Sequence, residues 1–178
     1  GPLDLRLNPE KGQSGAERLR EMNREEIVGM LTENADEPYA EQIARVIMKY
    51  YYMGKPVETT SDLRHCVEEA LSFLPKKEQK DAVKKSCQRT FQAIRIDVNS
   101  EFEVLYSFLE KLPDVLNEGG RVAVLTFHSG EDRLVKKSFK ELQKQGVYSK
   151  VARDVIRPSH EEIIRNSRSK CTKMRWAV

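Results

Sequence analysis

The sequence is poor in the residues that build disulfide frameworks, metal centres and membrane spans. Its 178 residues include three cysteines and three histidines. Cys66, Cys87 and Cys171 lie far apart without a CxxC pair, which argues against a disulfide framework or a zinc site. No apolar run is long enough to cross a bilayer, and the N-terminus shows no signal-peptide pattern. We therefore expect a cytoplasmic protein with no membrane partner and no metal.

Glycine is also sparse, and none of the nine glycines falls in a GxGxxG-like loop, the phosphate-binding pattern of nucleotide-binding folds. Charge, in contrast, is plentiful: charged residues make up 33% of the chain and hydrophobic residues 39%. This balance is typical of a helix-rich globular protein and excludes a disordered chain. The formal net charge of +3 is too small to indicate a nucleic-acid partner by itself.

The first half of the chain shows helical patterning. Two capping boxes predict helix starts, Ser14 with Glu17 and Asn23 with Glu26. Apolar residues at helical spacing predict two further helices, over 40–51 and 61–74. A lysine-rich stretch at 76–85 follows, which we expect to be exposed and mobile. Residues 14–85 are therefore predicted to form a compact helical unit without strands.

The second half mixes helices and strands. Apolar spacing predicts one long helix over 91–112, ended by Pro113. Segment 121–127, RVAVLTF, is apolar on both faces and predicts a buried strand of a parallel sheet. Further elements are expected as a helix from Ser129, strands at 147–156 and 171–178, and a short helix at 161–164. This order is typical of the end of a doubly wound α/β domain whose other strands come from elsewhere.

A polar cluster, FHSGEDR, follows the predicted strand at 121–127. Ligands of open α/β sheets bind beyond the carboxyl ends of the strands, so these side chains are candidate site residues. The chemically active members are His128, Glu131, Asp132 and Arg133. Ser129 has the spacing to cap the next helix. The alternative interpretation of the cluster is a helix cap with an internal ion pair.

Three other polar patterns have two interpretations each. Arg89, Gln92, Arg95 and Asn99 share one side of the long helix and could bind phosphate, a base edge or a partner carboxylate, or tie that helix to the helical unit. Asp4 and Arg6 lie two residues apart in a proline-bounded loop, a weak pattern alone. Near the C-terminus the cations form a run without an acid that could meet RNA phosphate or simply face solvent, namely Arg165, Arg168, Lys170, Lys173 and Arg175.

Five segments in order carry a family resemblance: GPLDLRL, GQSGAERL, RTFQAIRIDVN, GGRVAVLTFHSGEDRLVKKSF and IRPSHEEIIRNSRSKCTKMRWAV. Together they cover essentially the whole chain, which resembles the bacterial 16S rRNA cytosine-N4 methyltransferases of the MraW type. The resemblance implies an incomplete Rossmann-like methyltransferase sheet, made of its C-terminal strands, with an inserted all-helical domain. Residues 1–13 would be an active-site loop, 14–85 the helical insert, and 86–178 the C-terminal half of the methyltransferase domain.

The resemblance also implies a function, which is S-adenosylmethionine-dependent methylation of cytosine N4 in small-subunit ribosomal RNA. The partner would be that RNA or the assembling small subunit, and a homodimer is left open. Asp4 is the first candidate for orienting the amine and Asp132 the second, while Arg6, Arg95 and Arg133 would hold phosphates or these acids. The family's cofactor-binding motifs precede GPLD, so we expect the chain alone to be inactive and not to bind the cofactor. The alternatives are a non-catalytic RNA-binding or ribosome-associated module and a helical interaction protein.

The sequence departs from the family pattern at two positions. The family usually reads HSLEDR, and Gly130 here replaces the leucine, which loosens the start of the helix. The family often has an aromatic residue where Arg18 stands, so the base pocket of this protein is expected to differ.

Overall fold

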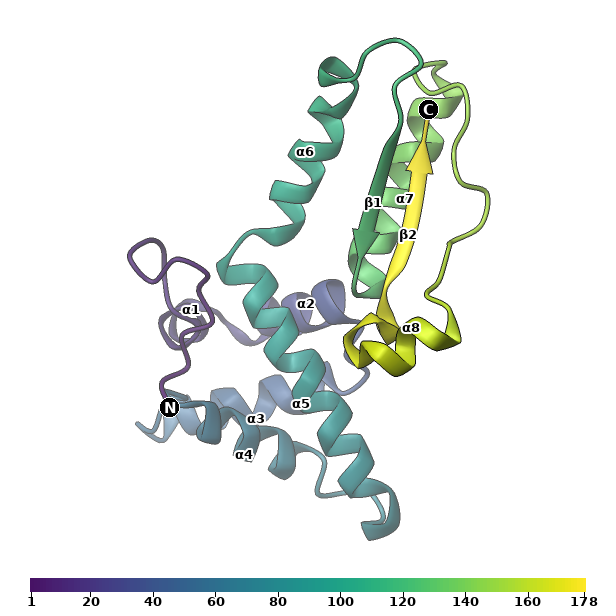
Figure 1. The fold of residues 1–178 in the computed structure, drawn as a ribbon. Coiled ribbons are helices and arrows are strands. Elements are labelled where there is room, and N and C mark those ends of the chain that lie inside the picture. The colour runs from purple at the N-terminus through teal and green to yellow at the C-terminus, as the bar shows by residue number, and fades with distance from the viewer. The chain divides into compact units, whose positions relative to one another are not determined.

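The computed structural model describes all 178 residues and divides them into two compact units, Gly1–Ser100 and Glu101–Val178 (Figure 1). The architecture is α/β, with eight α-helices and one two-stranded antiparallel sheet. The domain boundary predicted between residues 85 and 86 falls inside a continuous helix, α5 (Lys76–Val98). The assignment of 14–85 to an inserted domain stays a prediction.

Unit 1, Gly1–Ser100, is built from five helices, which are α1 (Gly15–Glu21), α2 (Arg24–Ala35), α3 (Ala40–Tyr52), α4 (Thr60–Ala70) and α5. Both predicted capping boxes are confirmed, since Ser14 and Asn23 accept the backbone N–H three residues on and the glutamates there accept in return. Thr59 opens α4 in the same way with Asp62. These starts are fixed by local sequence because each cap satisfies backbone N–H groups that have no helical partner.

The core of unit 1 lies between α2, α3, α4 and α5. Side chains that are fully buried there include Ile27, Leu31, Ile43, Leu63 and Ile94. Each contributes about 1.5–3 kcal/mol by burial, which holds the helices together. The lysine-rich stretch forms the first turns of α5, where Ala82 and Val83 pack against this core while the lysines stay exposed.

The prediction of one long helix over 91–112 is wrong. The chain forms α5 and then α6 (Glu101–Val115), and between them Ser100 adopts a left-handed backbone with φ of 49°. Asn99 donates its side-chain amide to the Arg95 carbonyl and ends α5. Apolar spacing missed this break because residues on both sides keep the helical period. Pro113 lies inside α6, two residues before its end.

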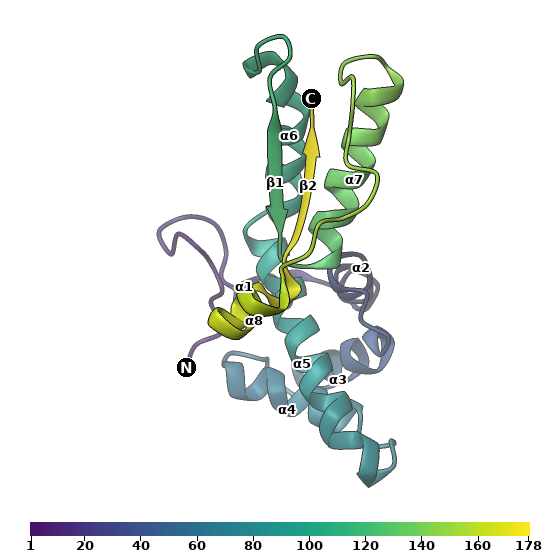
Figure 2. The ribbon, with the colours of Figure 1, turned by 45° about the vertical axis from the view of Figure 1, so that its right-hand side comes forward.

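Unit 2, Glu101–Val178, places its helices around a two-stranded ribbon. Its elements are α6, β1 (Val122–Thr126), α7 (Ser129–Lys144), α8 (His160–Arg165), the 3-10 helix η1 (Ser167–Cys171) and β2 (Lys173–Ala177). The strands pair antiparallel from Val122 with Ala177 to Thr126 with Lys173. α7 lies along both strands and packs on α6 (Figure 2). The small core of this unit is centred on Leu109, Leu112, Val135, Phe139 and Tyr148.

Two strand predictions in unit 2 need correction. β1 was expected to be buried in a parallel sheet, but its one partner is antiparallel, and Leu125 and Phe127 are 58% and 55% exposed. Segment 147–156 was expected to be a strand, but it makes two isolated bridges, Val151 to Ala177 and Ile156 to Met174, because the chain bends at residues 153 and 154 between them. No helix in the structure is both long and apolar enough to span a bilayer.

Candidate functional site

The predicted cluster FHSGEDR lies where β1 ends and α7 begins. The prediction that Ser129 caps α7 is wrong, because Ser129 is already the first helical residue. His128 has the extended backbone of a cap, and its Nδ1 accepts the Glu131 N–H at 3.4 Å. The Glu131 carboxylate in turn accepts the Phe127 N–H at 2.9 Å. A ring nitrogen therefore takes the place of the expected hydroxyl, and it fixes where both side chains point.

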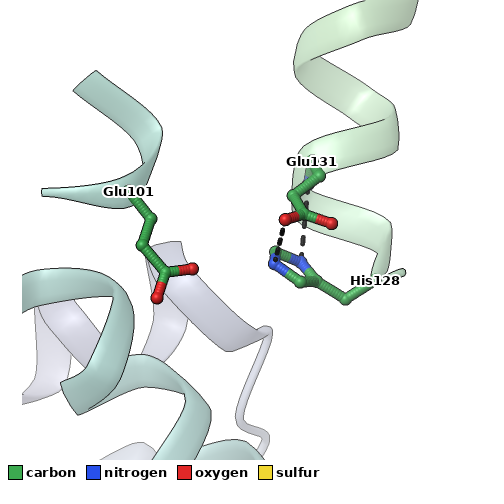
Figure 3. Close-up of side chains that lie close together, drawn as sticks. All are labelled: Glu101, His128 and Glu131. Atoms are coloured by element: carbon green, nitrogen blue, oxygen red, sulfur yellow. Dashed lines mark hydrogen bonds and ion pairs between the residues drawn. The ribbon is translucent and has the colours of Figure 1, made fainter. Parts of the chain in front are cut away.

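Glu101 joins His128 and Glu131 in one cluster of unit 2 (Figure 3). One side-chain oxygen or nitrogen of each residue lies within 4.8 Å of the other two, and His128 Nε2 is 3.5 Å from Glu131 Oε1. Glu101 comes from the first turn of α6 and points toward the imidazole. Sequence reasoning missed it because it treated Glu101 as the middle of a long helix. The one available signal was Asn99-Ser100, a pair that favours a helix break.

In this cluster the helix cap engages Nδ1 of the imidazole, and Nε2 lies at an ion-pair distance from Glu131 Oε1. Because His128 Nδ1 accepts the capping N–H, the neutral ring carries its proton on Nε2, which faces Glu131. A metal bound at Nε2 would require that proton to move to Nδ1, against the Glu131 N–H.

Asp132 is bound on both of its oxygens by Arg175. The guanidinium of Arg175, on β2, donates at 2.7 and 3.2 Å, and the two side chains are only 7% and 14% exposed. Burial acts to raise the pKa of Asp132, but the hydrogen bonds and charge of Arg175 outweigh it and lower the pKa overall. The pair ties the start of α7 to the end strand. Arg175, which the sequence placed in an exposed basic run, is buried.

Asp4 and Arg6 form a second carboxylate–guanidinium pair, in the loop at the start of unit 1. Arg6 Nε lies 2.6 Å from Asp4 Oδ1 and Nη2 lies 2.9 Å from Oδ2, while Nη1 donates to the Gly12 carbonyl. The Asp4 side chain keeps 37% of its surface exposed. Hydrogen bonding from Arg6 lowers the pKa of Asp4, so the carboxylate is ionised at neutral pH. The loop presents an oriented acceptor to solvent.

The loop that carries Asp4 is held from three sides. Asp4 and Leu3 accept backbone N–H groups from the start of α1, and Leu3 donates to Glu58 before α4. Asn99 donates to the Leu5 carbonyl and accepts the Leu7 N–H. Leu5 itself sits at φ of 66°, a conformation that costs free energy in a non-glycine residue and needs such anchoring. The Asp4 carboxylate is thus positioned by rigid helices.

The predicted RNA-binding residues fall into two groups. In unit 1 Asn99 is used to hold the loop, Arg89 borders a hollow with Pro38 and Lys85, and Gln92 and Arg95 follow on the same helix. Arg18, the departure from the family pattern, pairs with Asp97 at 2.7 Å. In unit 2 the cations Arg165, Arg168, Lys170 and Lys173 lie on α8, η1 and β2, and the first three are exposed. Arg133 is exposed on the first turns of α7.

A family model described as the MraW methylase family matches residues 1–178. The chain belongs to the MraW methylase family. A relative from Lachnoclostridium phytofermentans, named ribosomal RNA small subunit methyltransferase H 1, is 64% identical over all of this chain, which covers 49% of the relative. The protein of the same name from Agathobacter rectalis is 60% identical, with 51% of it covered. Ribosomal RNA small subunit methyltransferase H of Pseudothermotoga lettingae is 39% identical. The chain spans about half the length of these relatives.

Proposed function

We propose that this chain is the C-terminal part of an S-adenosylmethionine-dependent enzyme that methylates cytosine N4 in small-subunit ribosomal RNA. The observation that supports it most is the match along the entire chain to relatives named as small-subunit rRNA methyltransferases. The substrate RNA, or the assembling small subunit, would be its partner.

The β1–α7 junction does not fit the cofactor. A methyltransferase site needs an acid for the ribose hydroxyls and an open glycine turn for close backbone approach. Here Asp132 is taken by Arg175, Glu131 accepts the Phe127 N–H, and the space beside Gly130 is filled by the Phe102 ring. We therefore place the cofactor site in the part of the relatives that this chain does not cover.

Asp4 is the residue that we assign to the reacting amine. The lone pair of the cytosine amine is delocalised into the ring, which makes it a poor nucleophile. An ionised carboxylate that accepts one of its N–H bonds pulls the amine toward a pyramidal geometry and stabilises the positive charge that develops on nitrogen. Because Arg6 keeps Asp4 ionised and fixed, Asp4 orients the amine but is a weak base.

Two roles remain for the other candidates. His128 and Glu131 lie with Glu101 in a cluster of unit 2, and both stay candidates for a catalytic role of that cluster. Asp132 is better assigned to structure, since both oxygens are already engaged. The exposed cations of the C-terminal run would contact RNA phosphates, because no aromatic residue lies between Arg165 and Arg175 to stack on bases.

A chimeric enzyme tests the proposal. This chain replaces the matching half of the Lachnoclostridium phytofermentans relative, and the product is incubated with undermethylated small subunits and the cofactor. Mass spectrometry of the nucleosides should show N4-methylcytidine. A different methylated base would refute the cytosine assignment. A chimera that binds RNA and methylates nothing, beside an active parent, would favour the non-catalytic module.

The same chimera tests the role of Asp4. Asp4→Asn keeps the shape and removes the charge, so turnover should fall about a hundredfold while RNA affinity is unchanged. Glu10→Gln removes a carboxylate from the same loop and should leave turnover within about twofold. Equal losses in both variants would show a general effect of loop charge.

A further inference from the structure

Helices α4 and α5 of unit 1 border an open groove of about 1000 Å³ that none of the predicted sites uses. Val83, Cys87 and Phe91 pack against the core and give the groove an apolar surface. The first turn of α4 contributes Thr60 and Ser61. The groove therefore combines an apolar floor with polar groups at a helix start.

Three lysines follow the groove along α5. Lys76, Lys80 and Lys84 are spaced by four residues, so they share one helix face at steps of about 6 Å. All three are exposed, and the ion pair on this part of α5 joins Asp81 to Lys85 instead. The result is a row of cations beside an apolar surface.

The two carboxylates in the groove do not neutralise this row. Glu68 pairs with Arg64 on α4 at 2.8 Å, and Asp81 lies 4.0 Å from Lys85, which is outside the groove. Each acid thus has a cation of its own. The groove keeps the charge of its lysines for an anionic occupant.

We propose that this groove binds a single-stranded segment of RNA, with phosphates on Lys76, Lys80 and Lys84 and a base against Phe91. Proteins that bind single strands combine a positively charged groove with aromatic side chains on which bases stack. An acidic peptide would match the lysines and leave the apolar floor unused, whereas a nucleotide uses both. The inference rests on the proposed function, because it assigns a second contact for the same RNA substrate outside the Asp4 loop.

Binding by the 178-residue chain tests the groove directly. Fluorescence anisotropy with a labelled single-stranded RNA of mixed sequence is measured over a salt series. The triple variant Lys76→Ala, Lys80→Ala, Lys84→Ala should bind at least about tenfold more weakly. Its log–log salt slope should be smaller by about 2, as expected for three phosphate contacts to a single strand. A wild-type chain that binds no RNA would overturn the proposal.

Helix α7 offers a matched control, since Lys136, Lys140 and Lys144 have the same four-residue spacing and are also exposed. Their triple alanine variant removes the same charge and should change the affinity less than about threefold. Equal losses of RNA affinity in both triple variants would mean that binding depends only on net charge, which would overturn the proposal of a binding groove. Circular dichroism confirms that each variant is folded.

Two further measurements separate RNA from an acidic peptide. Phe91→Leu keeps an apolar side chain in the core and removes the ring, so RNA binding should weaken about fivefold with an unchanged salt slope. Polyglutamate should not displace the RNA at an equal concentration of charge. If polyglutamate displaced the RNA and Phe91→Leu did not change RNA affinity, the groove would be assigned to acidic peptides. The methylation assay of the chimera does not depend on these results, so failure of the groove leaves the proposed function standing.

Discussion

The two carboxylate–guanidinium pairs of this protein have the same chemistry in opposite surroundings. Asp4 and Arg6 lie two residues apart on a surface loop, and their side chains keep 37% and 18% of their surface exposed. Asp132 and Arg175 lie 43 residues apart, and neither side chain exceeds 14% exposure. Both aspartates have lowered pKa values because an arginine binds them. Neither the residue types nor the direction of the pKa shift therefore distinguishes a pair in a candidate functional site from a pair that only stabilises the fold.

The two pairs differ in burial and in whether the carboxylate can accept a further hydrogen bond. The exposed Asp4 carboxylate can accept another hydrogen bond on its solvent side while Arg6 holds it from the other. Asp132 joins α7 to β2 through Arg175. Removing Arg175 would leave the Asp132 carboxylate charged, unpaired and largely shielded from water. We expect changes at Asp132–Arg175 to affect folding, and changes at Asp4–Arg6 to affect function.

The largest expected effect on stability follows from Arg175→Ala. Because Asp132 would stay buried without its partner, the free energy of unfolding of unit 2 should fall by about 3 kcal/mol. Urea unfolding followed by circular dichroism measures it. Arg168→Ala removes an exposed cation of the same unit and should cost less than about 0.5 kcal/mol. Equal costs would show that the buried pair contributes nothing special.

The second prediction concerns acid. The pKa of Asp132 lies below its ordinary value of 3.8 in the folded protein, so the stabilisation by Arg175 is complete above that value. It is lost as the pH falls through the folded-state pKa. Unfolding curves at pH 7 and near pH 3 should show a larger loss of stability for the native unit 2 than for Arg175→Ala. Parallel losses would contradict the assignment of this pH dependence to the pair.

Much of the fold could be predicted where the cause is local. Ser14 and Asn23 cap helices through residues three positions on, so a short window of sequence contains both partners. The pairing of Asp132 with Arg175 spans 43 residues, and that of Asn99 with Leu7 spans 92. No periodicity predicts such contacts, which is why Arg175 was expected on a basic surface and Asn99 was left with open alternatives.

For the candidate site, the sequence predicted the position of the cluster but not its cap or all of its members. The position of FHSGEDR after a strand was correct, since a strand followed by a polar turn and a helical period is visible in sequence. The cap was assigned to Ser129 because serine is the commoner cap, whereas the backbone of His128 turns its ring onto the Glu131 N–H. Glu101 was missed with the break at Ser100, which only the backbone reveals.

A smaller effect is expected at Gly130, beside the buried pair. An alanine Cβ there would lie 2.5 Å from Phe102 Cζ, so the ring must move. Alanine also gains about 1 kcal/mol of helix propensity over glycine, which offsets that cost. Gly130→Ala should therefore be close to neutral alone and should stabilise unit 2 by about 1 kcal/mol in a Phe102→Leu background. A double-mutant cycle by urea unfolding measures the coupling between the two positions. If the changes in unfolding free energy simply add, the Phe102 ring moves aside without a measurable cost.

The smallest effect on global stability is expected at the exposed pair. Arg6→Ala removes the two side-chain hydrogen bonds to Asp4 and the bond to the Gly12 carbonyl, and it keeps the backbone N–H bond to Asp4 Oδ1. The anchors from Asn99 and from the start of α1 remain, so the urea midpoint of unit 1 should hardly move. Hydrogen exchange should instead become faster at the backbone amides of position 6 and Leu7, because opening the loop no longer breaks the side-chain pair. Arg20→Ala, which removes an exposed partner of Glu58, serves as the control and should leave those amides unchanged. A large midpoint shift for Arg6→Ala would mean that the exposed pair supports the fold as the buried one does, and the distinction drawn from burial would fail.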